Sequence, residues 1–296
     1  MPLPEPLLLS EHPAVPLDPA MGKVWFVGAG PGDPELITAK GRSLIERAGA
    51  ILFAGSLVSE AATRWAPDDC LVLDSKDMTL EEMSAWLIAQ AARCRVVVRL
   101  QTGDPGLYGA LIELVQPLDA AGIELEVVPG VSAINACTAL VGAPLMHDFC
   151  SISLSDLLTP WPVIARRLDA VAAADFVVAL CNPKSGRRTQ QILQAQQLFL
   201  RHRKPDTPVA VVKSAYRRRE CIEFTTLDHM SDCDIGMLST GLIGWMENLC
   251  ADHADGETVS ALALRHQLPV DYIDRVLNAP PDEAAPEAVA VEESEG

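Results

Sequence analysis

Short apolar runs alternate with amphipathic stretches along most of the chain. The runs are rich in β-branched residues and bounded by turn residues, a pattern typical of buried strands. We expect strands at Val24–Val27, Ala50–Phe53, Val96–Leu100, Leu125–Val128, Phe176–Leu180 and Val209–Val212. The intervening patterns predict helices at Pro34–Ala48, Thr79–Ala92, Leu107–Ala121 and Thr189–His202. Strands that alternate with helices form parallel sheets covered by helices, so an α/β fold is expected.

The length of 296 residues favours two domains, and the segment Gly142–Pro144 is the expected hinge. The proline-rich start shows no periodicity, and Met21 is an alternative start of the protein. The last eighteen residues hold six acids and no base. We expect a flexible leader at 1–21, an N-terminal α/β domain at 22–143, a C-terminal α/β domain at 144–250, a short helical appendage at 251–278 and an acidic disordered tail at 279–296.

Charge and composition narrow the function classes. Forty acids against 23 bases give a net charge of −17, which argues against nucleic acid or a membrane surface as the default partner. No apolar run approaches the ~18 residues that span a bilayer, and Pro6–Leu9 is too short for a signal core, so we expect a cytoplasmic protein. The eight cysteines form no C-x-x-C pair, so buried reduced thiols and no metal site are predicted.

Three glycine-containing turns each follow a predicted strand. They read VGAGPGDP at Val27–Pro34, LQTGDPGLYG at Leu100–Gly109 and VVPGVSA at Val127–Ala133. The first is neither a dinucleotide fingerprint, because Asp33 takes the third glycine position, nor a Walker loop. Taken alone, this first turn is equally explained as the start of a helix. Ligands of open parallel sheets bind outside the carboxyl ends of strands, so three such turns together favour one shared small-molecule site.

Two further segments complete a family pattern: GAPLMHD at Gly142–Asp148 and NP at Asn182–Pro183. In this order the five motifs resemble those of the tetrapyrrole (corrin/porphyrin) methylases, S-adenosylmethionine-dependent enzymes that methylate uroporphyrinogen and precorrins. The first half, with FAGSLV at Phe53–Val58, is similar to precorrin-4 C-11 methyltransferases. The second half, with HDFCSISLSDLLTPW at His147–Trp161, is similar to precorrin-3B C-17 methyltransferases. This match is the more continuous, so C-17 methylation in cobalamin biosynthesis is the favoured expectation and C-11 the alternative.

The resemblance also implies an architecture and a set of site residues. Two α/β domains, each with a mostly parallel sheet flanked by helices, would hold the active site in a trough between them, and the enzyme would be a homodimer. The residues implied to bind S-adenosylmethionine are Pro31, Thr102, Gly103, Asp104, Leu107, Tyr108, Ser132, Ala133, Cys181 and Ala215. Asp104 is the catalytic candidate, because its carboxylate would stabilise the positive charge of the methyl donor or bind the donor's hydroxyls. The alternative is that Asp104 caps the helix that follows. Ser132 is also expected to be a helix N-cap.

The chemistry implied needs alignment more than a strong acid or base, because the sulfonium methyl is already activated and the macrocycle carbon is the nucleophile. Residues 161–220 hold twelve bases and four acids, although the whole chain is acidic. Arginine binds carboxylates through two N–H groups, and precorrins carry several carboxylates. The residues predicted to bind the tetrapyrrole are Ser155, Asp156, Arg187, Arg188 and Arg218, with Arg217 and Arg219 as further candidates. For each arginine a solvated surface position is the alternative.

Three other interpretations stay open. His147 beside Asp148 is expected to be a structural pair at the hinge rather than a metal ligand or a base. An RNA methyltransferase of the same fold is suggested by the basic segment, but its relatives differ at Thr102–Tyr108. A non-catalytic S-adenosylmethionine-binding protein would share every motif above, and only an assay for methyl transfer separates it from an enzyme.

Overall fold

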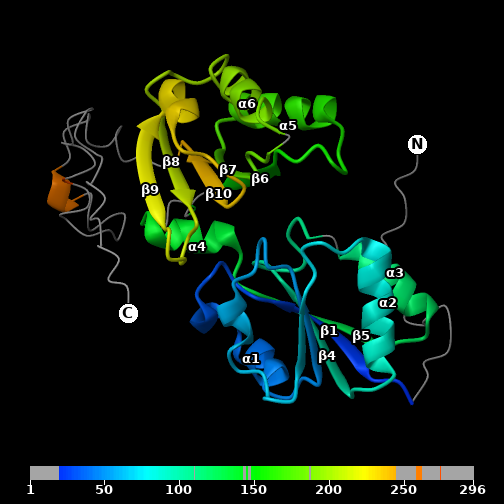
Figure 1. Cartoon of the computed structure of the whole chain (residues 1–296). Helices are drawn as coiled ribbons and strands as arrows, with labels where there is room; N and C mark the ends of the chain where they lie inside the picture. The colour runs from blue at the N-terminus through cyan, green and yellow to red at the C-terminus, as the bar shows by residue number, and fades with distance from the viewer. Residues whose placement is uncertain are drawn as a thin grey trace. The chain divides into compact units, whose positions relative to one another are not determined.

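The computed structural model describes residues 20–109, 111–142, 145, 148–186, 188–244, 258–261 and 274. These residues fall into two compact units, the first comprising Met1–Ala136 with Ser214–Arg218 and the second Cys137–Lys213 with Arg219–Gly296 (Figure 1). The division lies within helix α4 (Ala133–Leu140), ahead of the expected hinge. Nearly all of the predicted leader, appendage and tail lies outside the described residues.

The first unit contains a sheet of five parallel strands, in the order β3-β2-β4-β1-β5. Their bounds are β1 Lys23–Gly28, β2 Ala50–Phe53, β3 Leu71–Asp74, β4 Val96–Gln101 and β5 Leu125–Val128. Helix α1 (Ala39–Ile45) covers one face, and α2 (Leu80–Ala91) and α3 (Ile112–Ala120) cover the other (Figure 1). Connections leave β1 and β4 in opposite directions, so these neighbours form the topological switch point of the sheet.

Two predicted helices of this unit differ from the observed ones. The stretch Pro34–Ala48 is divided into a 3-10 turn, η1 (Pro34–Leu36), and α1, because the Thr38 hydroxyl caps α1 by accepting the Gly41 N–H at 3.2 Å. Helix α3 begins at Ile112 rather than at Leu107, and Tyr108 has a left-handed φ of 57° that ends any helix there. The predicted helix Thr79–Ala92 is confirmed as α2, with Thr79 and Glu82 in a capping box.

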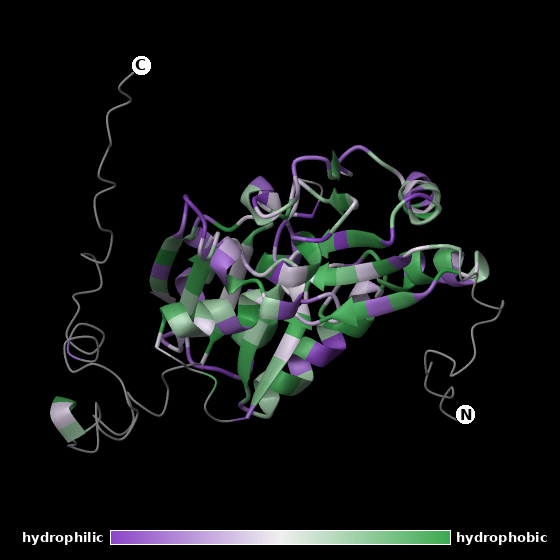
Figure 2. Cartoon of the chain, turned by 90° about the horizontal axis from the view of Figure 1, so that it is seen from below, coloured by the Kyte–Doolittle hydropathy of each residue, from purple (hydrophilic) through white to green (hydrophobic). Residues whose placement is uncertain are grey.

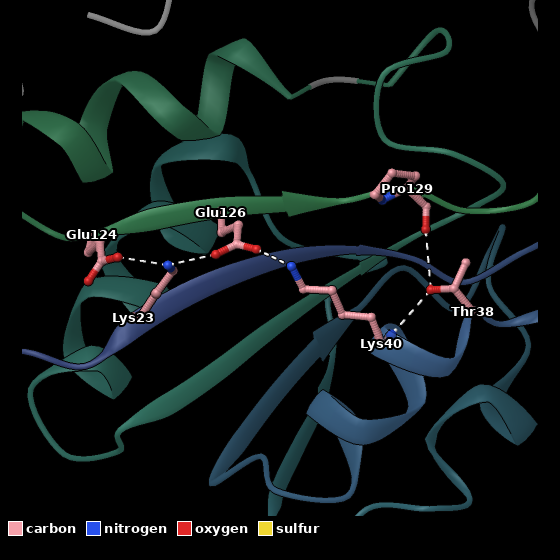
Figure 3. A network of polar contacts seen from close by, with 7 residues as sticks. Lys23, Thr38, Lys40, Glu124, Glu126 and Pro129 are labelled. Atoms are coloured by element: carbon pink, nitrogen blue, oxygen red, sulfur yellow. Dashed lines mark hydrogen bonds and ion pairs between the residues drawn. The ribbon is translucent and has the colours of Figure 1, made fainter. Parts of the chain in front are cut away.

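An ion-pair network connects β1, β5 and the start of α1 (Figure 3). Lys23 Nζ lies 2.7 Å from carboxylate oxygens of both Glu124 and Glu126, and Lys40 also pairs with Glu126. The Thr38 hydroxyl donates to the Pro129 carbonyl at 3.5 Å. These contacts place the end of β5 beside the turn that precedes α1.

The second unit contains a mixed sheet, in the order β6-β7-β10-β8-β9. Its strands are β6 Phe149–Ser153, β7 Val177–Cys181, β8 Pro208–Lys213, β9 Cys221–Thr226 and β10 Ser239–Ile243. Only β6 and β7 pair in parallel, and the other three pairings are antiparallel. The expectation of a mostly parallel second sheet is therefore wrong. The connection between β8 and β9, Ser214–Glu220, is shorter than the dozen or more residues of a parallel crossover.

The core of the second unit lies between its sheet and three helical segments. These are α5 (Trp161–Ala173), α6 (Gln191–Phe199) and the 3-10 segment η3 (Leu227–Asp232), which bury residues such as Leu168, Phe199 and Met230. Hydrophobic residues concentrate along the strands of both sheets, and hydrophilic residues occupy many of the loops (Figure 2).

Candidate functional site

The three glycine turns predicted from the sequence meet at the carboxyl edge of the first sheet. Strand β1 pairs with β4 on one side and β5 on the other, so parallel pairing brings the three strand ends together. The Gly30 N–H donates to the Gly103 carbonyl at 3.2 Å, and the Gly103 N–H donates to the Gly30 carbonyl at 2.8 Å. A Cβ on Gly130 would lie 2.2 Å from the Gly103 carbonyl oxygen and 2.7 Å from the Gly28 Cα. The backbones of the turns are thus in direct contact, which only glycine permits.

Asp104 connects two of these turns through its carboxylate. Its Oδ1 accepts the Gly106 N–H at 2.7 Å, and its Oδ2 accepts the Gly130 N–H at 2.8 Å. Asp104 does not cap α3, which begins eight residues later at Ile112. Hydrogen bonds from N–H groups to a carboxylate are among the stronger ones in proteins, so Asp104 holds the geometry of this edge.

The predicted donor-binding residues divide into exposed and buried groups. Thr102, Leu107, Tyr108 and Ala133 are exposed, and Leu107 and Tyr108 are 49% and 50% exposed. Ser132 is buried, and its hydroxyl donates to Asn135 Oδ1 at 2.7 Å and accepts the Asn135 N–H at 3.4 Å. Ser132 therefore makes the bond expected of an N-cap at the start of α4.

The segment Ser214–Arg218 groups with the first unit although β8 and β9 flank it in sequence. Ala215 is buried there. The Arg217 side chain donates from Nε to the Pro31 carbonyl at 2.8 Å and from Nη2 to the Leu57 carbonyl. Burial lowers the pKa of Arg217. Arg217 was a candidate to bind a substrate carboxylate, but two of its nitrogens donate to the protein's own backbone carbonyls. The neighbouring Arg218 is exposed.

Sequence reasoning missed a buried arginine just before the same edge. Arg99, in β4, is 6% exposed, and its Nη1 donates to the Ser75 hydroxyl at 3.1 Å. Burial lowers the pKa of Arg99 to about 10, although the nearby Asp74 raises it. The Arg99 Nε and the Gln101 Oε1 are both buried without a hydrogen-bond partner among the described residues. The sequence feature that could have identified Arg99 is its position as a charged residue inside the apolar run Val96–Leu100.

In the second unit, polar side chains gather after β6 and β7. Arg188 Nη1 donates to the Ser155 hydroxyl, and its Nη2 donates to the Asn182 carbonyl, both at 3.0 Å. The Asn182 amide donates to the Ser153 hydroxyl at 3.0 Å, and Asn182 has a φ of 50°. The structure therefore brings together Ser155 and Arg188, which were both predicted to bind substrate.

The loop after β6 also presents apolar side chains to solvent. Asp156 is exposed and accepts a hydrogen bond from the Gln191 amide at 2.9 Å. Leu157 and Leu158 follow it and are 84% and 73% exposed. Arg187, the remaining predicted substrate residue, lies outside the described residues.

Cys181 lies at the end of β7 and is 9% exposed. Its Sγ is 3.8 Å from the Ser151 hydroxyl, and burial raises the pKa of the thiol to about 11. Burial raises the pKa of Cys137 to about 12. Both thiols are neutral at physiological pH. All cysteines among the described residues are free; Cys137 and Cys181 are buried as expected, whereas Cys221 is exposed.

In the part of the chain that the structure describes, no three His, Cys, Asp or Glu side chains are arranged to hold a metal ion. In the same part, no helix is both long and apolar enough to cross a bilayer. His147 of the expected hinge pair lies outside the described residues.

Comparison with known proteins identifies the family. The family described as Tetrapyrrole (Corrin/Porphyrin) Methylases matches residues 23–231. A cobalt-factor III methyltransferase of Priestia megaterium is 45% identical over 230 residues, which are 75% of this chain and 42% of that protein. A probable cobalt-factor III C(17)-methyltransferase of Salmonella typhimurium is 37% identical over 224 residues, 74% of this chain and 90% of that protein. The chain thus spans less than half of the Priestia relative and most of the Salmonella one.

A third relative and two solved structures extend the comparison. A cobalt-precorrin-4 C(11)-methyltransferase of Methanocaldococcus jannaschii is 46% identical over 117 residues, 40% of this chain and 45% of that protein. The structure of a cobalt precorrin-4 methyltransferase superposes with a TM-score of 0.68 at 32% identity and covers 78% of this chain and 98% of that one. The structure of a Thermus thermophilus uroporphyrin-III C-methyl transferase, complexed with S-adenyl homocysteine, superposes with a TM-score of 0.60 at 26% identity. This match covers 77% of this chain and 95% of that one. The predicted family is confirmed: the chain belongs to the tetrapyrrole (corrin/porphyrin) methylases.

Proposed function

We propose that this protein is an S-adenosylmethionine-dependent methyltransferase that methylates C-17 of a tetrapyrrole in cobalamin biosynthesis, with cobalt-factor III and precorrin-3B as candidate substrates. The observation that carries the proposal is the length of the match to the Salmonella C(17) relative, 90% of that protein. The match to the Methanocaldococcus C(11) relative has higher identity but spans 40% of this chain. C-11 methylation is therefore the second candidate.

The carboxyl edge of the first sheet fits the proposed methyl donor. Gly28, Gly103 and Gly130 lie at the strand ends without side chains, and a Cβ on Gly130 would lie 2.2 Å from the Gly103 carbonyl oxygen. Exposed Thr102, Leu107 and Tyr108 offer a hydroxyl and apolar surface beside it. When bound, S-adenosylmethionine supplies an activated methyl group. Pro31, Thr102, Gly103, Asp104, Leu107, Tyr108, Ser132, Ala133 and Ala215 are the first-unit residues that we propose to hold it.

In this proposal the protein's own groups act by positioning. The Asp104 carboxylate, held by the N–H groups of Gly106 and Gly130, keeps the turns at a fixed separation. Holding two reactants in a near-attack geometry contributes on the order of 7–11 kcal/mol to catalysis. The pre-formed backbone of this edge supports that mode of catalysis.

Substrate binding is proposed for the polar residues of the second unit and for Arg218. The Arg188 guanidinium already holds Ser155 and Asn182, so we assign it the role of setting the Ser155 loop, with Asp156 beside it. Arg218 is exposed and suits a carboxylate of the macrocycle. Four expectations stay predictions: contact of Cys181 with the methyl donor, contact of Arg187 with the substrate, a homodimer and a cytoplasmic location.

The decisive experiment follows a labelled methyl group. The purified protein is incubated with S-adenosylmethionine carrying a ¹³C methyl and, separately, with cobalt-factor III, precorrin-3B and precorrin-4. We expect a mass gain of one methyl with one of the first two substrates and a label at C-17 by NMR. Label at C-11 of precorrin-4 would establish the second candidate. Binding of S-adenosylhomocysteine by calorimetry with transfer to none of the three would favour a non-catalytic binding protein.

A further inference from the structure

The segment Ser214–Arg218 packs closely against the turn after β1. A Cβ on Gly32 would lie 2.3 Å from the Arg217 Cγ and 2.8 Å from the Tyr216 carbonyl oxygen. Neither atom is the free end of a side chain, so neither moves aside at low cost. Gly32 is therefore required by the close approach of Tyr216 and Arg217.

The backbone of this segment is held in an uncommon conformation. Ser214 and Tyr216 have φ values of 54° and 57°, in the left-handed region that non-glycine residues rarely adopt. The Arg217 N–H closes the turn by donating to the Ser214 carbonyl at 2.9 Å. Such conformations persist only where surrounding contacts determine them, and they concentrate at functional sites.

The Arg217 guanidinium joins this segment to two other loops of the first unit. Nε donates to the Pro31 carbonyl at 2.8 Å, in the turn after β1, and Nη2 donates to the Leu57 carbonyl, in the turn after β2. The Leu57 turn is itself closed by a bond from the Leu57 N–H to the Ala54 carbonyl at 2.9 Å. A planar fork with fixed N–H directions suits two separate carbonyls better than a flexible ammonium does.

We propose that Arg217 is a positioning residue of the methyl-donor site, where it holds the Pro31–Gly32 turn against the segment that carries Ala215. This inference rests on the proposed function, because Pro31 and Ala215 are donor-binding residues only in that proposal. It replaces the earlier expectation that Arg217 grips a substrate carboxylate, since two of its nitrogens are bound to backbone carbonyls.

The test uses the full chain and the variants Arg217→Ala, Arg217→Lys and Gly32→Ala. Arg167→Ala is the matched control, because Arg167 is an exposed arginine on α5. Calorimetry measures the affinity for S-adenosylhomocysteine, and amide hydrogen exchange measures protection at residues 28–36 and 54–60. We expect Arg217→Ala to weaken S-adenosylhomocysteine about tenfold and to raise exchange in both segments. Arg217→Lys should recover part of the affinity, and Arg167→Ala should change neither reading.

A double variant, Gly32→Ala with Arg217→Ala, separates positioning from general damage. If both residues act through one contact, the double variant should bind S-adenosylhomocysteine about as well as the weaker single variant. An Arg217→Ala protein that is less stable yet binds S-adenosylhomocysteine with unchanged affinity would overturn the proposal. Should the unaltered protein not bind S-adenosylhomocysteine at all, the proposed function fails, and the exchange of residues 28–36 still decides whether Arg217 holds the turn.

Discussion

The strand ends that carry the candidate site residues are built in opposite ways in the two units. In the first unit, backbone meets backbone: a methyl group added to Gly28 or Gly130 would overlap main-chain atoms, including the Gly103 carbonyl oxygen. In the second unit, side chains do the joining, because Arg188 holds Ser155 and Asn182 through its guanidinium. The first edge is therefore sensitive to added atoms, and the second is sensitive to removed ones.

The largest effect is expected from adding one carbon to the backbone edge. Gly130→Ala would place a Cβ 2.2 Å from a carbonyl oxygen, so the turns must separate, at a cost of about 3 kcal/mol. Urea unfolding and calorimetry with S-adenosylhomocysteine should show lower stability and lost binding. Gly236→Ala is the matched control, because no atom lies within 4 Å of a Cβ built there. Equal stability of the two variants would contradict the backbone-contact account.

The next effect tests whether Asp104 is structural or also catalytic. Asp104→Asn replaces one accepting oxygen by an NH₂ group that faces an N–H donor, so we expect a loss of about 2 kcal/mol in the free energy of unfolding. Unfolding and the rate of methyl transfer should be measured together. A variant with normal stability and a much lower transfer rate would instead place Asp104 at the reacting groups.

A smaller effect is expected at the side-chain edge. Arg188→Ala leaves the Ser155 hydroxyl and the Asn182 carbonyl without their donor, which should lower the free energy of unfolding by about 1–2 kcal/mol. Arg188→Lys should recover part of this loss. Tetrapyrrole affinity is compared at one salt concentration with that of Arg167→Ala. Reduced affinity with unchanged stability would show that Arg188 meets the substrate directly.

The smallest effect lies away from both edges, in the ion-pair network of Figure 3. Hydrogen bonds from Lys23 and then Lys40 lower the pKa of Glu126. The stabilisation is therefore present above the ordinary carboxyl pKa and is lost as the pH falls through the lowered one. Glu126→Gln should cost about 0.5 kcal/mol at neutral pH and nothing in acid, as measured by urea unfolding at several pH values. A cost that persists in acid would mean that packing, not charge, is lost.

The difference between the edges also explains what could be predicted from the sequence. Glycine turns at strand ends leave a visible pattern because no other residue fits, so the three turns and their meeting were predictable. Strands β3, β6, β9 and β10 were not predicted. The first three lie at sheet edges and expose apolar residues such as Leu71, Phe149 and Phe224. Strand β10 is central and buried, but its sequence STGLI begins with polar residues and glycine and so lacks an apolar run. Arg217 could not be told from Arg218 and Arg219, since only tertiary structure puts one of the three beside the Pro31 carbonyl.

That bond has a consequence for the order in which the protein is made. Pro31 and Arg217 lie 186 residues apart in sequence, although both belong to the first unit. A contact of such separation closes late, because the chain between its ends must first be ordered. On the ribosome, the first unit lacks this segment until residue 218 has been synthesised. The Arg217 bonds to the Pro31 and Leu57 carbonyls can therefore form only after about half of the second unit, residues 137–213, has been synthesised.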